Sequence, residues 1–362
     1  MHTANEKPPT GQGGGFFERS DLLARINVVA SRSAQIPRKG FYTEVVGIAQ
    51  APAGLPEVSC LYGGRPDVVS PLPHRTNGSM DAPSLDSLRQ EIDAIDGELH
   101  GLIRRRAALV DRIAASKPPG GLALRPGREA KVMRQRLDTH QGPFPAAAVY
   151  RMWREMMCAF TLMQTPDIKV AICRPHDQPG YWDLARDHFG CQITFVANDT
   201  PAQVLAAVRA NPSTLGAVPV PIEADAAPWW PLLAGRDATL PNVVARLPFL
   251  DMPNARARGI SAFVLARMGP EESDDDRALV SIESVGGLSR NRISGALAKA
   301  GLPAFTSVLD QLAGGVHHYL VELPGVIADS DKRLRELEAA LELQNGRVAA
   351  IGAYAVPATA RA

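Results

Sequence analysis

The sequence predicts a multidomain protein with an all-α unit, a truncated α/β unit and a ferredoxin-like α+β unit. Apolar residues recur at three- and four-residue steps over 85–113, which is typical of a long helix with one apolar stripe. Strands and helices alternate from residue 168, and a βαββαβ order follows from residue 277. We expect four parts: a mostly flexible extension at 1–80, the helical unit at 81–166, the α/β unit at 167–270 and the α+β unit at 277–356.

The extension at 1–80 is rich in Gly, Pro and Ser and holds one convincing periodic patch, at 16–30. A segment of this composition buries too little apolar surface to fold by itself. Because Met80 stands directly before the predicted first helix, residues 1–79 are either a flexible extension or not translated at all. The sequence leaves both open.

The helical unit is expected to contain one very long helix and two shorter ones. The first is predicted to run from 84 to 117 and to end before Pro118. At ~1.5 Å per residue it would be ~50 Å long, too long for one small unit to cover, so we expect a partner chain to cover the rest. A second helix is predicted from Pro126 and a third over 146–164. The side chains expected to point inward from the third are Val149, Trp153, Met156, Phe160 and Met163.

The α/β unit is predicted from strands that alternate with helical stretches. This order of elements implies a parallel sheet. The predicted strands are 168–173, 192–197, 215–222 and 261–268. The acidic loop at 271–276 follows, and the βαββαβ unit comes after it.

Composition excludes several classes of partner. The chain has 39 Lys and Arg against 38 Asp and Glu, so it offers no reason to expect a nucleic acid or an anionic membrane. No apolar run approaches the ~20 residues of a membrane span. The four cysteines form no C-x-x-C pair, which favours free thiols in a reducing cytosol. We therefore expect a cytoplasmic protein.

Arg106 lies on the apolar stripe, at a step where a hydrophobic residue is expected. A guanidinium there needs an anionic partner. Lys117 lies close to three helical turns further on, so both cations project from the same face. The pair indicates a pocket for a dianion, or two side chains that snorkel to the edge of the bundle; the pattern leaves both readings open.

Four more residues are candidates of the same site. Arg89 lies ~25 Å before Arg106 along the helix and on a different face, so it can reach such a pocket only from a partner subunit. Taken alone, Arg128 and Glu129 fit an ordinary solvated charge pair as well as a functional one, and Gln164 fits a surface amide.

The helical unit resembles the all-helical chorismate mutase family, especially the mutase part of bacterial chorismate mutase–prephenate dehydratase fusions. The resemblance rests on LRQEIDAIDGELHGLIRRRAALVDRIAASK, RPGREAKVMRQRL and WREMMCAFTLMQ, about 85 residues in all. It implies an intertwined homodimer, with sites shared between the subunits, that converts chorismate to prephenate in phenylalanine biosynthesis.

The resemblance also implies a role for each candidate residue. Arg106 and Lys117 would hold the substrate carboxylates, and Lys117 would also face the ether oxygen. Arg89 would reach a carboxylate from the other subunit, and Arg128 would support the carboxylate pocket. Glu129 would accept from the ring hydroxyl, and Gln164 would donate to the ether oxygen.

Two positions depart from one branch of this family. Arg125 replaces an acidic residue, which makes it a further candidate for substrate binding, and Phe160 replaces a serine. Neither change removes a charge that the reaction needs. The reaction is an intramolecular pericyclic shift, so we expect no metal or cofactor; the protein must orient the substrate and stabilise charge on the ether oxygen.

The C-terminal part resembles, weakly, a prephenate dehydratase domain followed by an amino-acid-binding (ACT) domain. Where that family has Thr-Arg-Phe, this chain has Ser261-Ala262-Phe263, so the arginine that would bind prephenate is absent. We expect this part to be catalytically inactive, retained for dimerisation or stability, or for binding an effector or a partner enzyme. The alternatives for the whole chain are a bifunctional mutase–dehydratase and a non-catalytic regulatory dimer.

Overall fold

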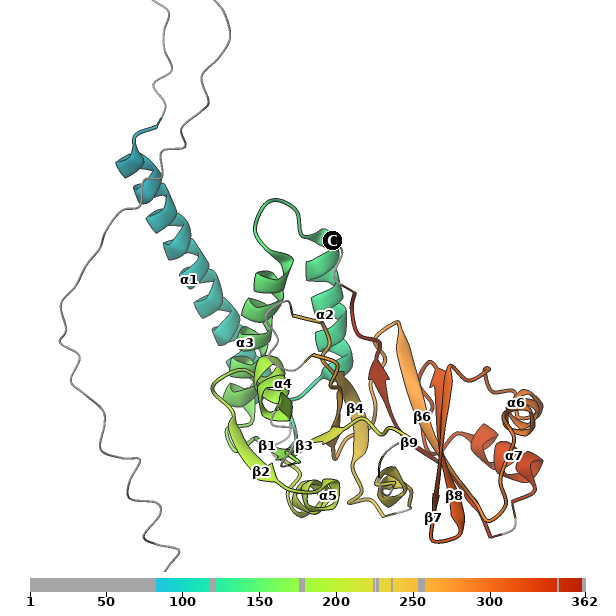
Figure 1. Cartoon of the computed structure of the whole chain (residues 1–362). Helices are drawn as coiled ribbons and strands as arrows, with labels where there is room; N and C mark the ends of the chain where they lie inside the picture. The colour runs from blue at the N-terminus through green and yellow to red at the C-terminus, as the bar shows by residue number, and fades with distance from the viewer. Residues whose placement is uncertain are drawn as a thin grey trace, which may run out of the picture. The chain divides into compact units, whose positions relative to one another are not determined.

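The computed structural model describes residues 83–116, 121–175, 180–223, 225, 228–235, 237–252, 258–343 and 345–359 (Figure 1). The extension predicted at 1–80 and the candidate Lys117 lie outside the described residues.

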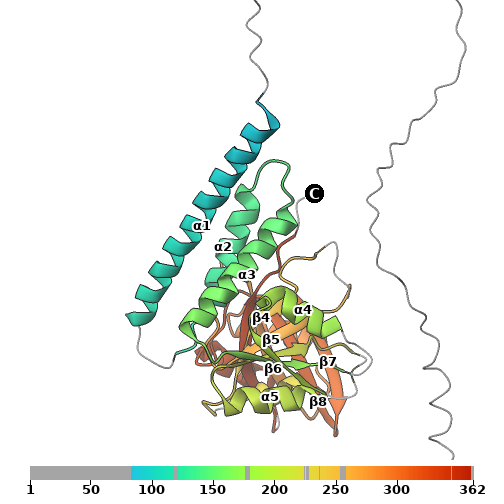
Figure 2. The same cartoon turned by 90° about the vertical axis from the view of Figure 1, so that its left-hand side faces the viewer.

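Three helices form the first part of the described chain, as the sequence predicts: α1 (Leu85–Ala115), α2 (Pro126–Thr139) and α3 (Ala146–Gln164). The Ser84 hydroxyl caps α1 by accepting a hydrogen bond from the Ser87 amide at 3.1 Å. Pro126 is the first residue of α2, where a missing N–H costs nothing. Figure 2 shows α1 running beside α3.

The apolar stripe of α1 stays open to solvent in the single chain. None of the residues of α1 is buried, and Leu99 and Leu102 are 49% and 51% exposed. A helix with such a stripe is stable in water when another surface covers it. That a second copy of the chain covers it stays a prediction.

The buried face of α3 differs from the predicted one. The buried side chains of α3 are Val149, Tyr150, Arg154, Met157, Cys158, Phe160 and Thr161. Of the predicted set, Met163 is exposed, and Trp153 and Met156 are only partly buried. The prediction selected Trp153, Met156 and Met163 for their apolar character, whereas the observed face also buries Arg154.

A nine-stranded sheet follows, in the order β2-β1-β3-β5-β4-β9-β6-β8-β7. Its strands are β1 (Lys169–Cys173), β2 (Thr194–Asn198), β3 (Thr214–Pro219), β4 (Asn242–Leu247), β5 (Ala262–Ala266), β6 (Asp276–Ser284), β7 (Ser307–Ala313), β8 (Val316–Pro324) and β9 (Arg347–Ala355).

The predicted parallel sheet is found only at one edge. β1 pairs in parallel with β2 and β3, whereas β5 is antiparallel to both β3 and β4. Strand β4 was not predicted. Helices α4 (Gly180–Phe189) and α5 (Pro201–Ala210) and the 3-10 helix η1 (Trp230–Leu233) connect these strands.

The last part has the βαββαβ order that the sequence predicts. Strands β9, β6, β8 and β7 are neighbours in that order, and each neighbouring pair is antiparallel. Helices α6 (Arg290–Lys299) and α7 (Lys332–Leu341) pack on this half of the sheet around buried residues such as Ile293 and Leu337.

The two halves of the sheet meet at β4 and β9, and the buried core that contains Trp230, Leu279 and Ile351 spans both halves. Strand β4 pairs with β9 through Val243 and Gly352. A Cβ on Gly352 would lie 2.1 Å from the Val243 carbonyl oxygen, and its φ of 134° is one that only glycine adopts readily. The glycine therefore permits the junction of the two halves.

Candidate active site

Arg106 of α1 and Arg128 of α2 are two exposed cations from different helices. The Arg106 guanidinium lies 4.3 Å from the ring centre of Phe160 on α3. Partial burial lowers the pKa of Arg106, and the positive charge of Arg128 lowers it further. Neither arginine forms a hydrogen bond or ion pair with any residue in the part of the chain that the structure describes. Two cations whose charges repel each other favour the binding of an anion near them.

The aromatic ring of Phe160 contacts the Arg106 guanidinium. The distance from Arg106 to the ring is within the range of a cation–π contact. The departure from the family at Phe160 therefore places an aromatic face under the predicted carboxylate-binding arginine.

Arg128 and Arg125 line a surface cavity of about 750 Å³. The other lining residues are Lys131, Val132, Gln135, Glu271 and Glu272. Arg125, the second departure from the family, forms an ion pair with Glu271, which belongs to the acidic loop before β6. The structure therefore places Arg125 and Arg128 at one cavity, which Arg106 does not line, and it already gives Arg125 an anionic partner.

Glu129 faces the interior of the helical unit, toward Arg154 on α3. The two side chains form an ion pair of 2.7 Å and are 15% and 3% exposed, respectively. Burial alone would lower the pKa of Arg154, but the charge of Glu129 outweighs it and raises that pKa. One carboxylate oxygen of Glu129 is thus held by Arg154, and its contact with a substrate hydroxyl stays a prediction.

Arg154 has further partners around this pair. Its Nε donates to the His188 carbonyl oxygen at 2.9 Å, and Cys158 lies one turn further along α3. Burial and the charge of Arg154 hold the pKa of His188 well below its usual range, so His188 is neutral at pH 7. The sequence contained a signal for Arg154, because it lies four residues after Tyr150 and four before Cys158 on one apolar face.

Of the remaining predicted residues, Gln164 and Arg89 have other partners, and Lys117 lies outside the described residues. Gln164 is partly buried at the end of α3, and its amide donates to the Phe160 carbonyl oxygen at 3.1 Å. Arg89 lies on the first turns of α1 and pairs with Asp86 at 3.2 Å. The roles of Gln164, Arg89 and Lys117 toward a substrate stay predictions.

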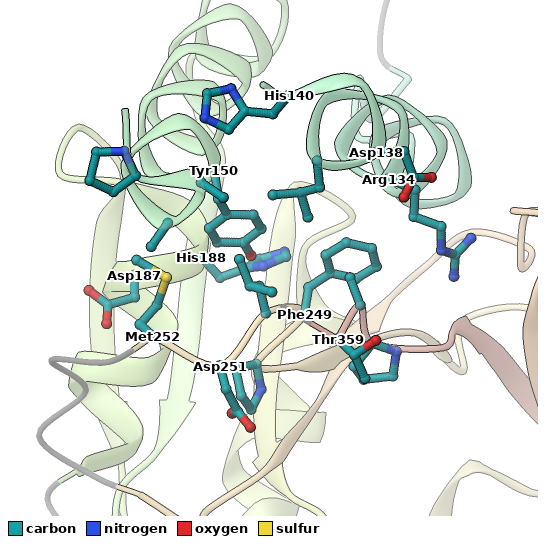
Figure 3. A pocket seen from close by; sticks show the side chains of 18 of the residues that line it. Arg134, Asp138, His140, Tyr150, Asp187, His188, Phe249, Asp251, Met252 and Thr359 are labelled. Carbon is teal, nitrogen blue, oxygen red and sulfur yellow. The ribbon is translucent and has the colours of Figure 1, made fainter. Parts of the chain in front are cut away.

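A larger cavity, of about 1060 Å³, lies between the α2–α3 connection, α4 and the segment after β4 (Figure 3). Tyr150 and Phe249 form part of its wall, with ring centres 6.4 Å apart. The charged side chains that line it are Asp138, Asp187, Asp251, Asp275, Arg134 and Arg258. This excess of carboxylates does not suit a dianion, and none of the predicted site residues lines the cavity.

Over the described ranges, no helix has the length and apolar character that a membrane crossing requires. In the same part of the chain, His, Cys, Asp and Glu side chains form no group of three that could hold a metal ion.

Comparison with known proteins finds a likeness to one family in the helical unit. Residues 88–165 match the family model "Chorismate mutase type II". This range contains α2, α3 and most of α1, and therefore Arg106, Arg128, Glu129 and Gln164.

Curated relatives have the name "Bifunctional chorismate mutase/prephenate dehydratase". The protein from Aquifex aeolicus is 31% identical over 141 residues, which are 38% of this chain and 38% of that protein. The protein from Pseudomonas aeruginosa is 30% identical over 146 residues, 39% of this chain and 40% of that one. The chain thus spans about two fifths of the length of the curated relatives that it matches.

Solved structures show only a weak likeness to the rest of the chain. The prephenate dehydratase from Streptococcus mutans gives a TM-score of 0.34 at 13% identity over 52% of this chain and 97% of that one. The prephenate dehydratase from Staphylococcus aureus gives 0.35 at 10% identity over 52% of this chain and 100% of that one. A likeness at this level says nothing about activity.

Proposed function

We propose that the chain is a cytoplasmic chorismate mutase, which converts chorismate to prephenate. The observation that carries the proposal is a pair of cations, Arg106 and Arg128, whose charges act on each other and which lack a carboxylate partner among the described residues. Chorismate is a dianion and would supply the missing negative charge. The match of residues 88–165 to the mutase family supports the same assignment.

The reaction requires this chain to orient the substrate and to stabilise the negative charge that develops on it. Arg106 and Lys117 hold the substrate carboxylates, Arg128 supports the carboxylate pocket, and together they keep the enolpyruvyl arm over the ring. Lys117 and Gln164 donate to the ether oxygen, where negative charge grows in the transition state. Even an acceleration of ~10⁶ needs ~8 kcal/mol, which a few charge-assisted hydrogen bonds of ~1.5–3 kcal/mol each can supply. No group in this scheme is a nucleophile, metal or cofactor.

The active form in this proposal is a homodimer with shared sites. The uncovered apolar stripe of α1 supports it, because leucine side chains that remain about half exposed in one chain gain stability when a second chain covers them. Arg89 lies on the same helix, far from Arg106. In the dimer it reaches the carboxylate pocket of the partner subunit.

The α/β part, in this proposal, does not dehydrate prephenate. At the position of the expected Thr-Arg-Phe motif, Ala262 and Phe263 lie in β5 and are each 1% exposed. A buried alanine cannot hold a substrate carboxylate. The ACT-like unit at 277–356 would then serve stability or effector binding. The alternative, a bifunctional enzyme, is favoured by the names of the curated relatives.

The test follows the loss of chorismate absorbance with the purified full chain. The product is then assayed for phenylpyruvate, both directly and after acid treatment, which converts prephenate to phenylpyruvate. The proposal requires chorismate loss and phenylpyruvate only after acid. Phenylpyruvate without acid would establish the bifunctional alternative, and unchanged chorismate would favour a non-catalytic dimer.

A further inference from the structure

Four cations occur at three-residue steps from the N-cap of α2 into the helix. They are Arg125, Arg128, Lys131 and Arg134. Each step of three residues falls about 60° short of a full helical turn, so the four side chains wind around the helix and the first and last are about half a turn apart. The loop Glu271–Asp276, which leads into β6, has five carboxylates in six residues and contacts three of these cations.

The loop partners three of the four cations. Arg125 pairs with Glu271, and the Lys131 ammonium lies 2.7 Å from Asp274 Oδ1. The Arg134 guanidinium donates to backbone carbonyl oxygens, among them that of Asp275 at 2.9 Å. Arg128 is left without such a partner within the described chain.

The loop is held by hydrogen bonds of its own, and it contacts the backbone of α2. Ser273 is fully buried, and its amide donates to Asp276 Oδ2 at 2.7 Å. A Cβ on Gly127 would lie 2.7 Å from the Glu272 carbonyl oxygen, so the helix and the loop are in direct contact. These two contacts fix the backbone of the loop against the backbone of α2. They therefore hold the Glu271 carboxylate beside Arg125.

We propose that Glu271 is a positioning residue for the substrate pocket: it holds Arg125 on the loop and leaves Arg128 and Arg106 to bind the substrate carboxylates. This inference rests on the proposed function. Arg125 and Arg128 line the same cavity, so a free Arg125 would add, beside Arg128, a second cation that has no ion-pair partner among the described residues. The C-terminal part thereby lowers the affinity of the helical unit for its dianionic substrate.

The variant Glu271→Gln in the full chain tests the proposal. Because it frees Arg125, KM for chorismate should fall about two- to fivefold, the size expected for one partly exposed charge. The value of kcat should stay within about twofold, and Tm should stay nearly unchanged. In an Arg125→Gln background the same substitution should leave KM unchanged.

Glu272→Gln is the matched control, because it removes a charge from the same loop and cavity without releasing Arg125. Its effect on KM should be the same with and without Arg125. If Glu271→Gln raises KM or leaves it unchanged, or acts equally in the Arg125→Gln background, the inference is wrong. A wild-type chain without turnover contradicts the proposed function instead; calorimetric binding of chorismate to the same variants then tests the role of Glu271, with Kd in place of KM.

Discussion

Arg154 lies at the centre of the helical unit, and its charge is almost completely enclosed. It is 2% exposed, and its ion pair with Glu129 joins α3 to α2. Removing one member of a buried ion pair leaves the other charge buried without a partner. This destabilises the fold more than replacing both members by apolar residues does.

Arg154→Met should therefore lower the free energy of unfolding by about 3–5 kcal/mol. Denaturant unfolding at pH 7 measures this loss. The control is Arg151→Met, on the same helix, because Arg151 pairs with Asp187 at a half-exposed position. That variant should lose about 1 kcal/mol or less. Equal, small losses in the two variants would contradict the structural role given to Arg154.

Gln164 should make the mutase reaction insensitive to pH. An amide donates a hydrogen bond at any pH, and the arginines stay charged, so the wild-type rate should be nearly flat between pH ~5 and ~9. In Gln164→Glu, only the protonated carboxyl donates, and burial raises its pKa above ~4.3. The rate of that variant should fall as the pH rises through this pKa.

Rates of both proteins measured across this pH range decide the matter. A steep acid optimum in the wild type, or full activity of Gln164→Glu at pH ~8, would mean that Gln164 does not contact the ether oxygen.

The sequence predicted Arg106 but not Arg154, although both are arginines on apolar helix faces. Arg106 interrupts a long regular stripe, which makes it conspicuous. Arg154 lies among aromatic residues and methionines on several sides of α3, so the position of the buried face could not be fixed. The pairing of Arg125 with Glu271 joins residues 146 positions apart, and no local pattern indicates it.

At the level of the element, the apolar stripe of α1 is open to solvent in the single chain. Its apolar residues are about half exposed over its whole length, and Arg89 lies at one end while Arg106 lies toward the other. A single chain does not bring these two arginines together.

Arg89→Ala and Arg106→Ala chains should each be inactive and should regain activity when mixed. In a heterodimer, one of the two shared sites has both arginines intact. Chorismate turnover is measured before and after subunit exchange, and native mass spectrometry verifies the exchange. Demonstrated heterodimers without recovered activity would refute the shared site.

The helices were easier to predict than the strands. The bounds of α3 agree with the prediction, because a run of three-to-four-residue steps covers the whole helix. Strand β4 was missed because it lies between Pro241 and Pro248 and has an irregular register near Val243. That irregularity removes the strict alternation by which a strand is found in a sequence.

Across the whole molecule, one sheet connects the α/β part with the βαββαβ part. The two were predicted as separate domains, and their boundaries stay predictions, but β4 and β9 pair directly at Gly352. The loop Glu271–Asp276 then links this sheet to α2. A structural change in the C-terminal part can therefore be transmitted to α2, the helix that contains Arg128.

The central claim is that Arg106 and Arg128 form the site that binds a dianionic substrate. The most direct test is kcat/KM for chorismate in the wild type, in Arg106→Ala and in Arg105→Ala, whose exposed side chain is the neighbouring cation on α1. Arg106→Ala should lose at least ~10³ in kcat/KM, because a charge-assisted bond is lost and substrate charge is left unpaired. Arg105→Ala should stay within about twofold. Near-normal turnover in Arg106→Ala would contradict the account.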